Sequence, residues 1–278
     1  MTNGPSNPNV TSARTRPGFR RLAPLTRYIS THAVLAVTAS VGGLVILGLT
    51  AASAAVYDAV AEKDGISSLD RPALDQVIAW RTPLANRIFT GFTHLGGPLL
   101  MTLIASAVTL LMVWRWRSLT PLILMIIAVA GSLTFTNVGK AIVGRARPPL
   151  SDAVPPYEHA FSFPSGHTLN STVIAGLVAY LVAIRLTSRL GVALCVVLVA
   201  ARAAAMGFSR VFLGHHWLTD VIFAWLLGLA WLALLITAHR IFLAVRIAET
   251  SPEPSQRQAG QRFSSTRGER CLIELRIR

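Results

Sequence analysis

Charged side chains are scarce in this chain. Only 14% of its 278 residues are Asp, Glu, Lys or Arg, whereas 53% are hydrophobic. Soluble globular domains carry about 25% charged residues, so the composition excludes an ordinary soluble domain. It predicts an integral membrane protein.

Cysteine is nearly absent. Cys195 lies in an apolar run and Cys271 near the C-terminus, so they offer neither a disulfide framework nor the spacing of a metal site. The net charge is +14, but the arginines lie at both ends of the chain and between apolar runs. Because no basic domain carries them, nucleic-acid binding is not expected.

Six apolar runs are separated by polar segments. They cover residues 33–55, 98–114, 119–138, 168–184, 190–208 and 217–238. Each has about the 17–25 residues that cross a bilayer. The sequence therefore predicts an all-α fold, a six-transmembrane-helix bundle at 33–245. Cytoplasmic tails at 1–32 and 246–278 are expected to be disordered. The oligomeric state is left open.

The first apolar run ends in Ala52-Ser53-Ala54, which resembles a signal-peptidase site. The polar region before the run is more than 30 residues long, so we expect an uncleaved anchor. The loop at 58–97 that follows has apolar residues at helical spacing, interrupted near Pro83. This pattern predicts an amphipathic interfacial helix in the first outer loop, or a helix packed over the outer helix ends.

Three short polar segments lie among the later runs: Lys140–Pro148, Pro164–His167 and Ser209–Asp220. With the N-terminus in the cytoplasm, 17 of the 26 lysines and arginines lie in cytoplasmic segments, as the positive-inside rule requires. All three polar segments then face the extracytoplasmic side of the plasma membrane. Charged residues among membrane helices cost several kcal/mol, so they are candidates for function.

His216 and Asp220 are spaced i, i+4 at the start of the last predicted helix, hence on one face. A carboxylate that accepts the proton of one ring nitrogen leaves the lone pair of the other free to attack. His215 is the rival nucleophile, but its spacing to Asp220 is poorer. The alternative for the pair is a structural role at the helix start.

His167 follows Pro164-Ser165-Gly166 at the start of the fourth predicted helix. Free backbone N–H groups and the helix dipole bind anions there, Gly166 allows close approach, and His167 could protonate a leaving oxygen. The alternative is a capped helix with an incidental histidine.

Positive charge for a phosphate comes from Lys140, Arg147 and Arg210. Arg145 is instead expected at the membrane interface, with its charge in the aqueous layer. Arg202 lies on nearly the same helix face as Ser209 and is expected to support the site from behind, with its partner left open.

These spacings resemble the type 2 phosphatidic acid phosphatase (PAP2) family, whose motifs are Lys-x6-Arg-Pro, Pro-Ser-Gly-His and Ser-Arg-x5-His-x3-Asp. The chain matches all three, with Lys140 and Arg147-Pro148, then Pro164–His167, then Ser209-Arg210, His216 and Asp220. The close match covers about 80 residues, and the six-helix layout extends it over most of the chain.

The resemblance implies a role for each residue. His216 attacks phosphorus, Asp220 orients it, and His167 protonates the leaving group and then activates water. The phosphoryl oxygens are held by Lys140, Arg147, Ser165, Gly166 and Arg210. The family needs no metal or other cofactor, and the outer face beyond residue 98 has too few carboxylates for a magnesium site.

The sequence therefore predicts a metal-independent membrane hydrolase acting on a lipid phosphate or diphosphate. Polyprenyl diphosphate, phosphatidylglycerol phosphate and phosphatidate all remain candidate substrates. A lipid-linked phosphotransferase of the same family is one alternative. A non-enzymatic transporter or scaffold is the alternative from another class.

Overall fold

The computed structural model describes residues 23–249, with side chains described for residues 33–246. Two compact units can be distinguished. Residues 39–240 form one unit, and the described residues 23–38 and 241–249 belong to the other. All the candidate site residues lie in the unit formed by residues 39–240.

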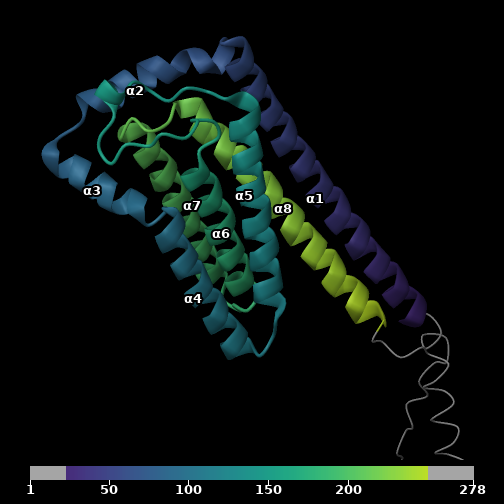
Figure 1. Ribbon diagram of the computed structural model, residues 1–278. Helices are drawn as coiled ribbons and strands as arrows, with labels where there is room; N and C mark the ends of the chain where they lie inside the picture. The colour runs from purple at the N-terminus through teal and green to yellow at the C-terminus, as the bar shows by residue number, and fades with distance from the viewer. Residues whose placement is uncertain (1–22, 250–278) are drawn as a thin grey trace, which may run out of the picture. The chain divides into compact units, whose positions relative to one another are not determined.

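Every regular element within residues 23–249 is helical (Figure 1). Six helices are long and apolar enough to cross a membrane. They are α1 (Ala23–Glu62), α4 (Pro98–Trp116), α5 (Thr120–Val143), α6 (Gly166–Ala183), α7 (Arg189–Phe212) and α8 (Leu218–Glu249). This confirms the predicted all-α fold with six membrane-spanning helices.

Two predicted boundaries fall inside helices. α1 begins at Ala23, so residue 33 marks the start of the apolar segment and not of the helix. α8 continues to Glu249, past the boundary at residue 245. Residues 1–22 and 250–278 lie outside the described part, and their predicted disorder stays a prediction. α1 is continuous through Ala52-Ser53-Ala54, and the uncleaved anchor also stays a prediction.

Local signals in the sequence set several helix ends. α4 and α5 each carry a proline in the first turn, Pro98 and Pro121, where a missing N–H costs nothing. α7 begins after Ser188, whose hydroxyl accepts a hydrogen bond from the N–H of Gly191 at 3.3 Å. These signals hold the loops between successive helices to short lengths at the end of the bundle opposite the site.

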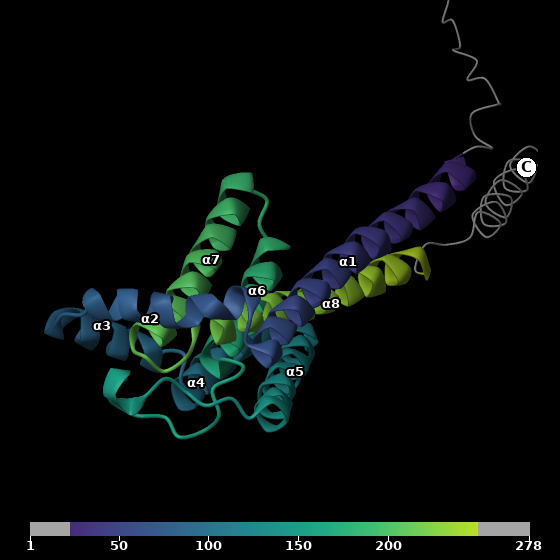
Figure 2. The same cartoon turned by 90° about the horizontal axis from the view of Figure 1, so that it is seen from above.

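The first outer loop contains two helices, α2 (Asp70–Ala79) and α3 (Pro83–His94), after a short 3-10 turn, η1 (Gly65–Leu69). The chain turns between the two helices because Pro83 starts α3, and the Thr82 hydroxyl caps it by accepting the N–H of Ala85 at 3.1 Å. Both helices cross one end of the bundle (Figures 1 and 2).

Both interpretations of this loop hold, one for each helix. α2 buries Leu74 and Val77 against the end of α7 and the start of α8, so it is the helix that packs over helix ends. α3 leaves Leu84 and Ile88 exposed beside buried Thr93, which is the pattern of an amphipathic helix.

α6 is the central helix of the bundle, because it packs against both α5 and α7. Its residues Leu169, Val173 and Leu177 are fully buried in a core shared with α4, α5 and α8. By contrast, α4 and α7 expose apolar side chains such as Leu103 and Val197 on their outer faces. Such outward apolar surface suits lipid hydrocarbon and not water.

Two glycines let the loops approach the helix ends closely. A Cβ on Gly139 of α5 would lie 2.6 Å from Cδ of Pro164, so glycine allows the segment before α6 to press against α5. Gly214, between α7 and α8, has φ +70°, and a Cβ there would lie 2.3 Å from the carbonyl oxygen of Asp152. Both contacts bring the loop between α5 and α6, which includes the 3-10 turn η2 (Leu150–Asp152), onto the start of α8.

Candidate active site

The predicted site residues come together at one end of the bundle. They lie at the end of α5 (Lys140), in the loop after it (Arg147), at the start of α6 (Ser165, Gly166, His167), at the end of α7 (Arg210) and around the start of α8 (His216, Asp220). Lys140, Gly166, His167 and His216 line a cavity of about 370 Å³. The side chain of Ser165 is fully buried and shares a hydrogen bond with the Thr168 hydroxyl at 2.9 Å.

His216 is held with one ring nitrogen toward Asp220 and the other toward Arg147. Its Nδ1 lies 3.3 Å from Oδ2 of Asp220, and its Nε2 lies 3.2 Å from Nη1 of Arg147. Because the guanidinium can only donate, this arrangement assigns the proton to Nδ1 and the lone pair to Nε2. Burial, followed by the positive charges of Arg210 and Arg147, lowers the pKa of His216 well below its usual value. The ring is therefore neutral at pH 7.

His215, the rival nucleophile, is turned to a structural contact. Its Nε2 lies 2.8 Å from the carbonyl oxygen of Val154 and donates to it. Burial and the charge of Arg210 lower the pKa of His215 to about 4, so this ring is also neutral at pH 7. Its contact holds the loop after η2 against the start of α8, whereas it is His216 that lines the cavity.

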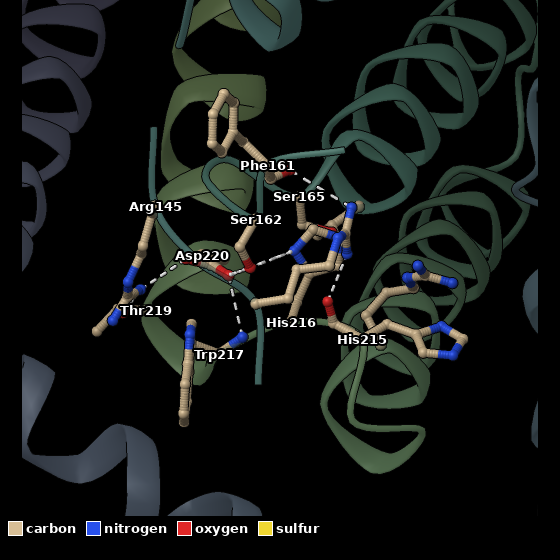
Figure 3. A network of polar contacts seen from close by, with 12 residues as sticks. Arg145, Phe161, Ser162, Ser165, His215, His216, Trp217, Thr219 and Asp220 are labelled. Atoms are coloured by element: carbon tan, nitrogen blue, oxygen red, sulfur yellow. Dashed lines mark hydrogen bonds and ion pairs between the residues drawn. The ribbon is translucent and has the colours of Figure 1, made fainter. Parts of the chain in front are cut away.

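The Asp220 carboxylate is fully buried and accepts several hydrogen bonds (Figure 3). Oδ2 accepts the Ser162 hydroxyl and the backbone N–H of Trp217, the latter at 3.0 Å, besides its contact with His216. Oδ1 accepts Nη1 of Arg145 at 2.6 Å. The carboxylate is thus fixed from three sides, which orients the imidazole beside it.

Arg145 corrects the sequence interpretation. It was expected at the membrane interface, but its side chain is only 19% exposed and pairs with both Asp220 and Asp70 at 2.6 Å. Its guanidinium also lies over the Trp217 ring, 5.6 Å from the centroid. A signal was present: residues two apart in an extended segment point to the same side, so Arg145 faces the start of α8 together with Arg147.

Arg147 and Arg210 converge on Glu158, a residue that the sequence interpretation did not select. Nη2 of Arg147 lies 2.8 Å from Oε2 of Glu158, and Nη2 of buried Arg210 pairs with Oε1. Burial would raise the pKa of Glu158, but the charge of Arg210 and other nearby positive groups hold it well below its usual value. This carboxylate occupies donors that a phosphate group would use.

His167 and Lys140 complete the polar wall of the cavity. Nδ1 of His167 lies 3.9 Å from Oε1 of Glu158. Nζ of Lys140 donates to the carbonyl oxygen of Phe161 at 2.5 Å. At the first turn of α6, backbone N–H groups have no partner within the helix, and they point toward the same space.

Arg202 stands apart from this constellation. Its buried Nη1 has no hydrogen-bond partner among the described residues, and no contact in the structure explains it. Within residues 33–246, no group of three or more His, Cys, Asp or Glu side chains is arranged to hold a metal ion.

Comparisons with known proteins agree with this arrangement. A sequence profile of the PAP2 superfamily matches residues 118–242. Phosphatidylglycerophosphatase B of Bacillus subtilis is 31% identical over 180 residues, which are 63% of this chain and 85% of that protein. An undecaprenyl-diphosphatase of Sulfolobus acidocaldarius is 31% identical over 134 residues, 47% of this chain and 56% of that protein.

A solved structure shares the fold. The crystal structure of a transmembrane PAP2-type phosphatidylglycerolphosphate phosphatase from Bacillus subtilis has a TM-score of 0.61 at 24% identity, and the match covers 75% of this chain and 98% of that one. The chain belongs to the PAP2 superfamily. It is a multi-pass membrane phosphatase, and a non-enzymatic transporter or scaffold is not supported.

Proposed function

We propose that this phosphatase hydrolyses the phosphate or diphosphate head group of a membrane lipid at the extracytoplasmic face, through a phosphohistidine on His216. The observation that carries the proposal is that the cavity beside His216 continues into an apolar groove between membrane helices. The relatives named as phosphatidylglycerophosphatase and undecaprenyl-diphosphatase support a lipid substrate.

The groove, defined here as the hollow between α4 and α5, has a volume of about 510 Å³. It shares Thr102, Val129, Leu133 and Ile174 with the cavity that contains His216. An apolar chain lying there would remain in a hydrocarbon environment while its head group reached the polar wall. Each methylene kept out of water contributes about 0.8 kcal/mol to binding.

The geometry supports a two-step reaction. Nε2 of His216 attacks phosphorus as the bond to the leaving oxygen breaks, and His167 donates a proton to that oxygen. Asp220 stabilises the positive charge that develops on the imidazole. In the second step His167 takes a proton from water, the water oxygen attacks phosphorus, the P–N bond breaks, and inorganic phosphate leaves.

Three cations and the start of α6 stabilise charge on the phosphoryl oxygens. Lys140, Arg147 and Arg210 approach from α5, the following loop and α7. They act in a largely buried site, where such stabilisation is worth more than in water. An entering phosphate has to compete with the Glu158 carboxylate for Arg147 and Arg210.

Phosphate release tests the proposed function directly. Purified full-length protein is assayed on phosphatidate, phosphatidylglycerol phosphate and a polyprenyl diphosphate, each with EDTA present. We expect release from at least one of them that is unaffected by EDTA. No release from any would refute the proposal, and a phosphorylated acceptor lipid in place of free phosphate would show a phosphotransferase.

Filling the groove should weaken long-chain substrates selectively. Ser106 of α4 is exposed and lines the groove, so Ser106→Trp should raise the KM for a long-chain lipid phosphate about tenfold. This corresponds to about two methylenes returned to water. Leu103→Trp is the matched control, because Leu103 is an exposed residue of the same helix outside the groove lining.

Hydrolysis of a short, water-soluble phosphate monoester separates blocking from misfolding. Its rate should be equal in the wild type, Ser106→Trp and Leu103→Trp. Equal long-chain KM values in the two variants would show that the chain does not lie between α4 and α5.

The sidedness of the site rests on the Lys and Arg distribution and is tested by thiol labelling. Tyr157 is exposed in the loop that carries Glu158, and Thr187 is exposed in the loop between α6 and α7 at the opposite end. In a background lacking Cys195 and Cys271, Tyr157→Cys should react with a membrane-impermeant reagent in intact cells. Thr187→Cys should react only after lysis. The reverse pattern would overturn the proposed orientation.

A further inference from the structure

A buried carboxylate outside the three motifs is built into the site. Asp70, the first residue of α2, is 4% exposed. Its Oδ1 accepts the backbone N–H of Thr219 at 2.8 Å, and its Oδ2 accepts the Thr219 hydroxyl at 2.7 Å. Oδ2 also accepts Nη2 of Arg145 at 2.6 Å. The first outer loop therefore reaches the start of α8 directly behind the Asp220–His216 pair.

Arg145 lies between two carboxylates. Its Nη2 binds Asp70, and its Nη1 binds Oδ1 of Asp220 and the hydroxyl of Thr219, the latter at 2.8 Å. One guanidinium fork thus spans both acids, and the Trp217 ring covers its face. Because such a planar fork has fixed directions, the position of Asp70 determines where Arg145 holds Asp220.

We propose that Asp70 and Arg145 form a positioning pair that fixes the Asp220 carboxylate and sets the charge behind His216. The inference rests on the proposed role of His216 as nucleophile. Neither residue lines the cavity, so the pair acts on the reaction through Asp220 and not through the substrate.

The charges explain why a second carboxylate is needed. A single Arg145–Asp220 pair would be neutral and would oppose the positive charge on His216 only weakly. With Asp70 included, the three groups carry one net negative charge, which stabilises the imidazole as its Nε2 bonds to phosphorus. Removing the charge of Asp70 leaves Arg145 drawn to Asp220 alone.

Asp70→Asn separates this role from simple helix capping, because asparagine keeps the shape and an oxygen acceptor for Thr219. We expect kcat on a lipid phosphate to fall by roughly 10- to 100-fold, the loss typical of one charge-assisted hydrogen bond. KM should stay within about threefold, since the substrate contacts remain. The single-turnover rate of phosphohistidine formation should fall with kcat.

Asp75→Asn is the matched control, because Asp75 is an exposed carboxylate on the same helix that pairs with Arg71. This variant should keep wild-type kcat, KM and thermal stability. A double-variant cycle supplies the second test. Arg145→Gln alone leaves Asp70 buried without its cation, whereas Asp70→Asn with Arg145→Gln leaves a neutral pair.

In the Arg145→Gln background, Asp70→Asn should lower kcat by less than about twofold, because the partner through which it acts is gone. Wild-type kcat for Asp70→Asn, or an equal loss in both backgrounds, would overturn the positioning pair. So would a loss confined to KM or to thermal stability. A wild-type protein inactive on all the lipid phosphates would instead refute the proposed function, and the pair with it.

Discussion

His216→Ala should remove nearly all phosphatase activity, a loss of about 10⁴-fold or more, while the protein still inserts and folds. The attacking lone pair is on Nε2, which lies toward Arg147 at the cavity, and alanine has no group to replace it. Wild-type protein quenched during turnover of a radiolabelled substrate should retain acid-labile phosphate, and the variant should retain none.

His215→Gln is the matched control for this experiment. His215 donates to the carbonyl oxygen of Val154, and a glutamine amide can donate in its place. This variant should keep kcat within about tenfold of the wild type, a change of ~1.4 kcal/mol in barrier. Activity of His216→Ala within the same range would show that His216 is not the nucleophile, and labelled phosphate lost only in His215→Gln would transfer the role to His215.

His167→Asn should damage monophosphate hydrolysis more than diphosphate hydrolysis. An alkoxide leaving group resembles hydroxide, whose conjugate acid has a pKa near ~16, so it needs a proton as the P–O bond breaks. A phosphate leaving group, with a second pKa of about 6, can depart largely unprotonated. General-acid assistance is worth roughly 10²–10⁴-fold, so the monophosphate loss should approach that range.

The contrast is measured on phosphatidate and on a polyprenyl diphosphate, with leaving-group release timed in a single turnover. A single turnover is needed because His167 also activates water in the second step, which affects both substrates. His94→Asn, at the exposed end of α3, provides a matched histidine substitution at the same end of the bundle. Equal losses on both substrates would mean that His167 binds or orients the phosphate and is not the acid.

The helices followed from the sequence because the bilayer leaves few alternatives. Hydrocarbon offers no hydrogen bonds to the backbone, so an apolar run of spanning length has to be helical. The six predicted runs accordingly match six helices, with errors only at the ends, such as the ten residues from Ala23 that precede the first run. Polar residues at helix ends carry no such constraint.

The core of the site also followed from short-range spacing. His216 and Asp220 are one helical turn apart, and Nδ1 and Oδ2 do meet, at 3.3 Å. The position of Arg145 did not follow, because its two carboxylate partners are each 75 residues away. Asp70 reaches Thr219 across 149 residues, through a loop helix whose packing no local pattern specifies.

The sequence by itself determined the six spanning helices, the placement of the three polar segments at one end and the neighbours one turn apart on a helix. Helical periodicity and bilayer thickness decide those features locally. Only the tertiary structure decided which histidine faces the cavity, that Glu158 and Arg145 join the site, and that a groove leads away between α4 and α5. Those features depend on how loops without a repeating period pack against helices, and packing is a property of the whole fold.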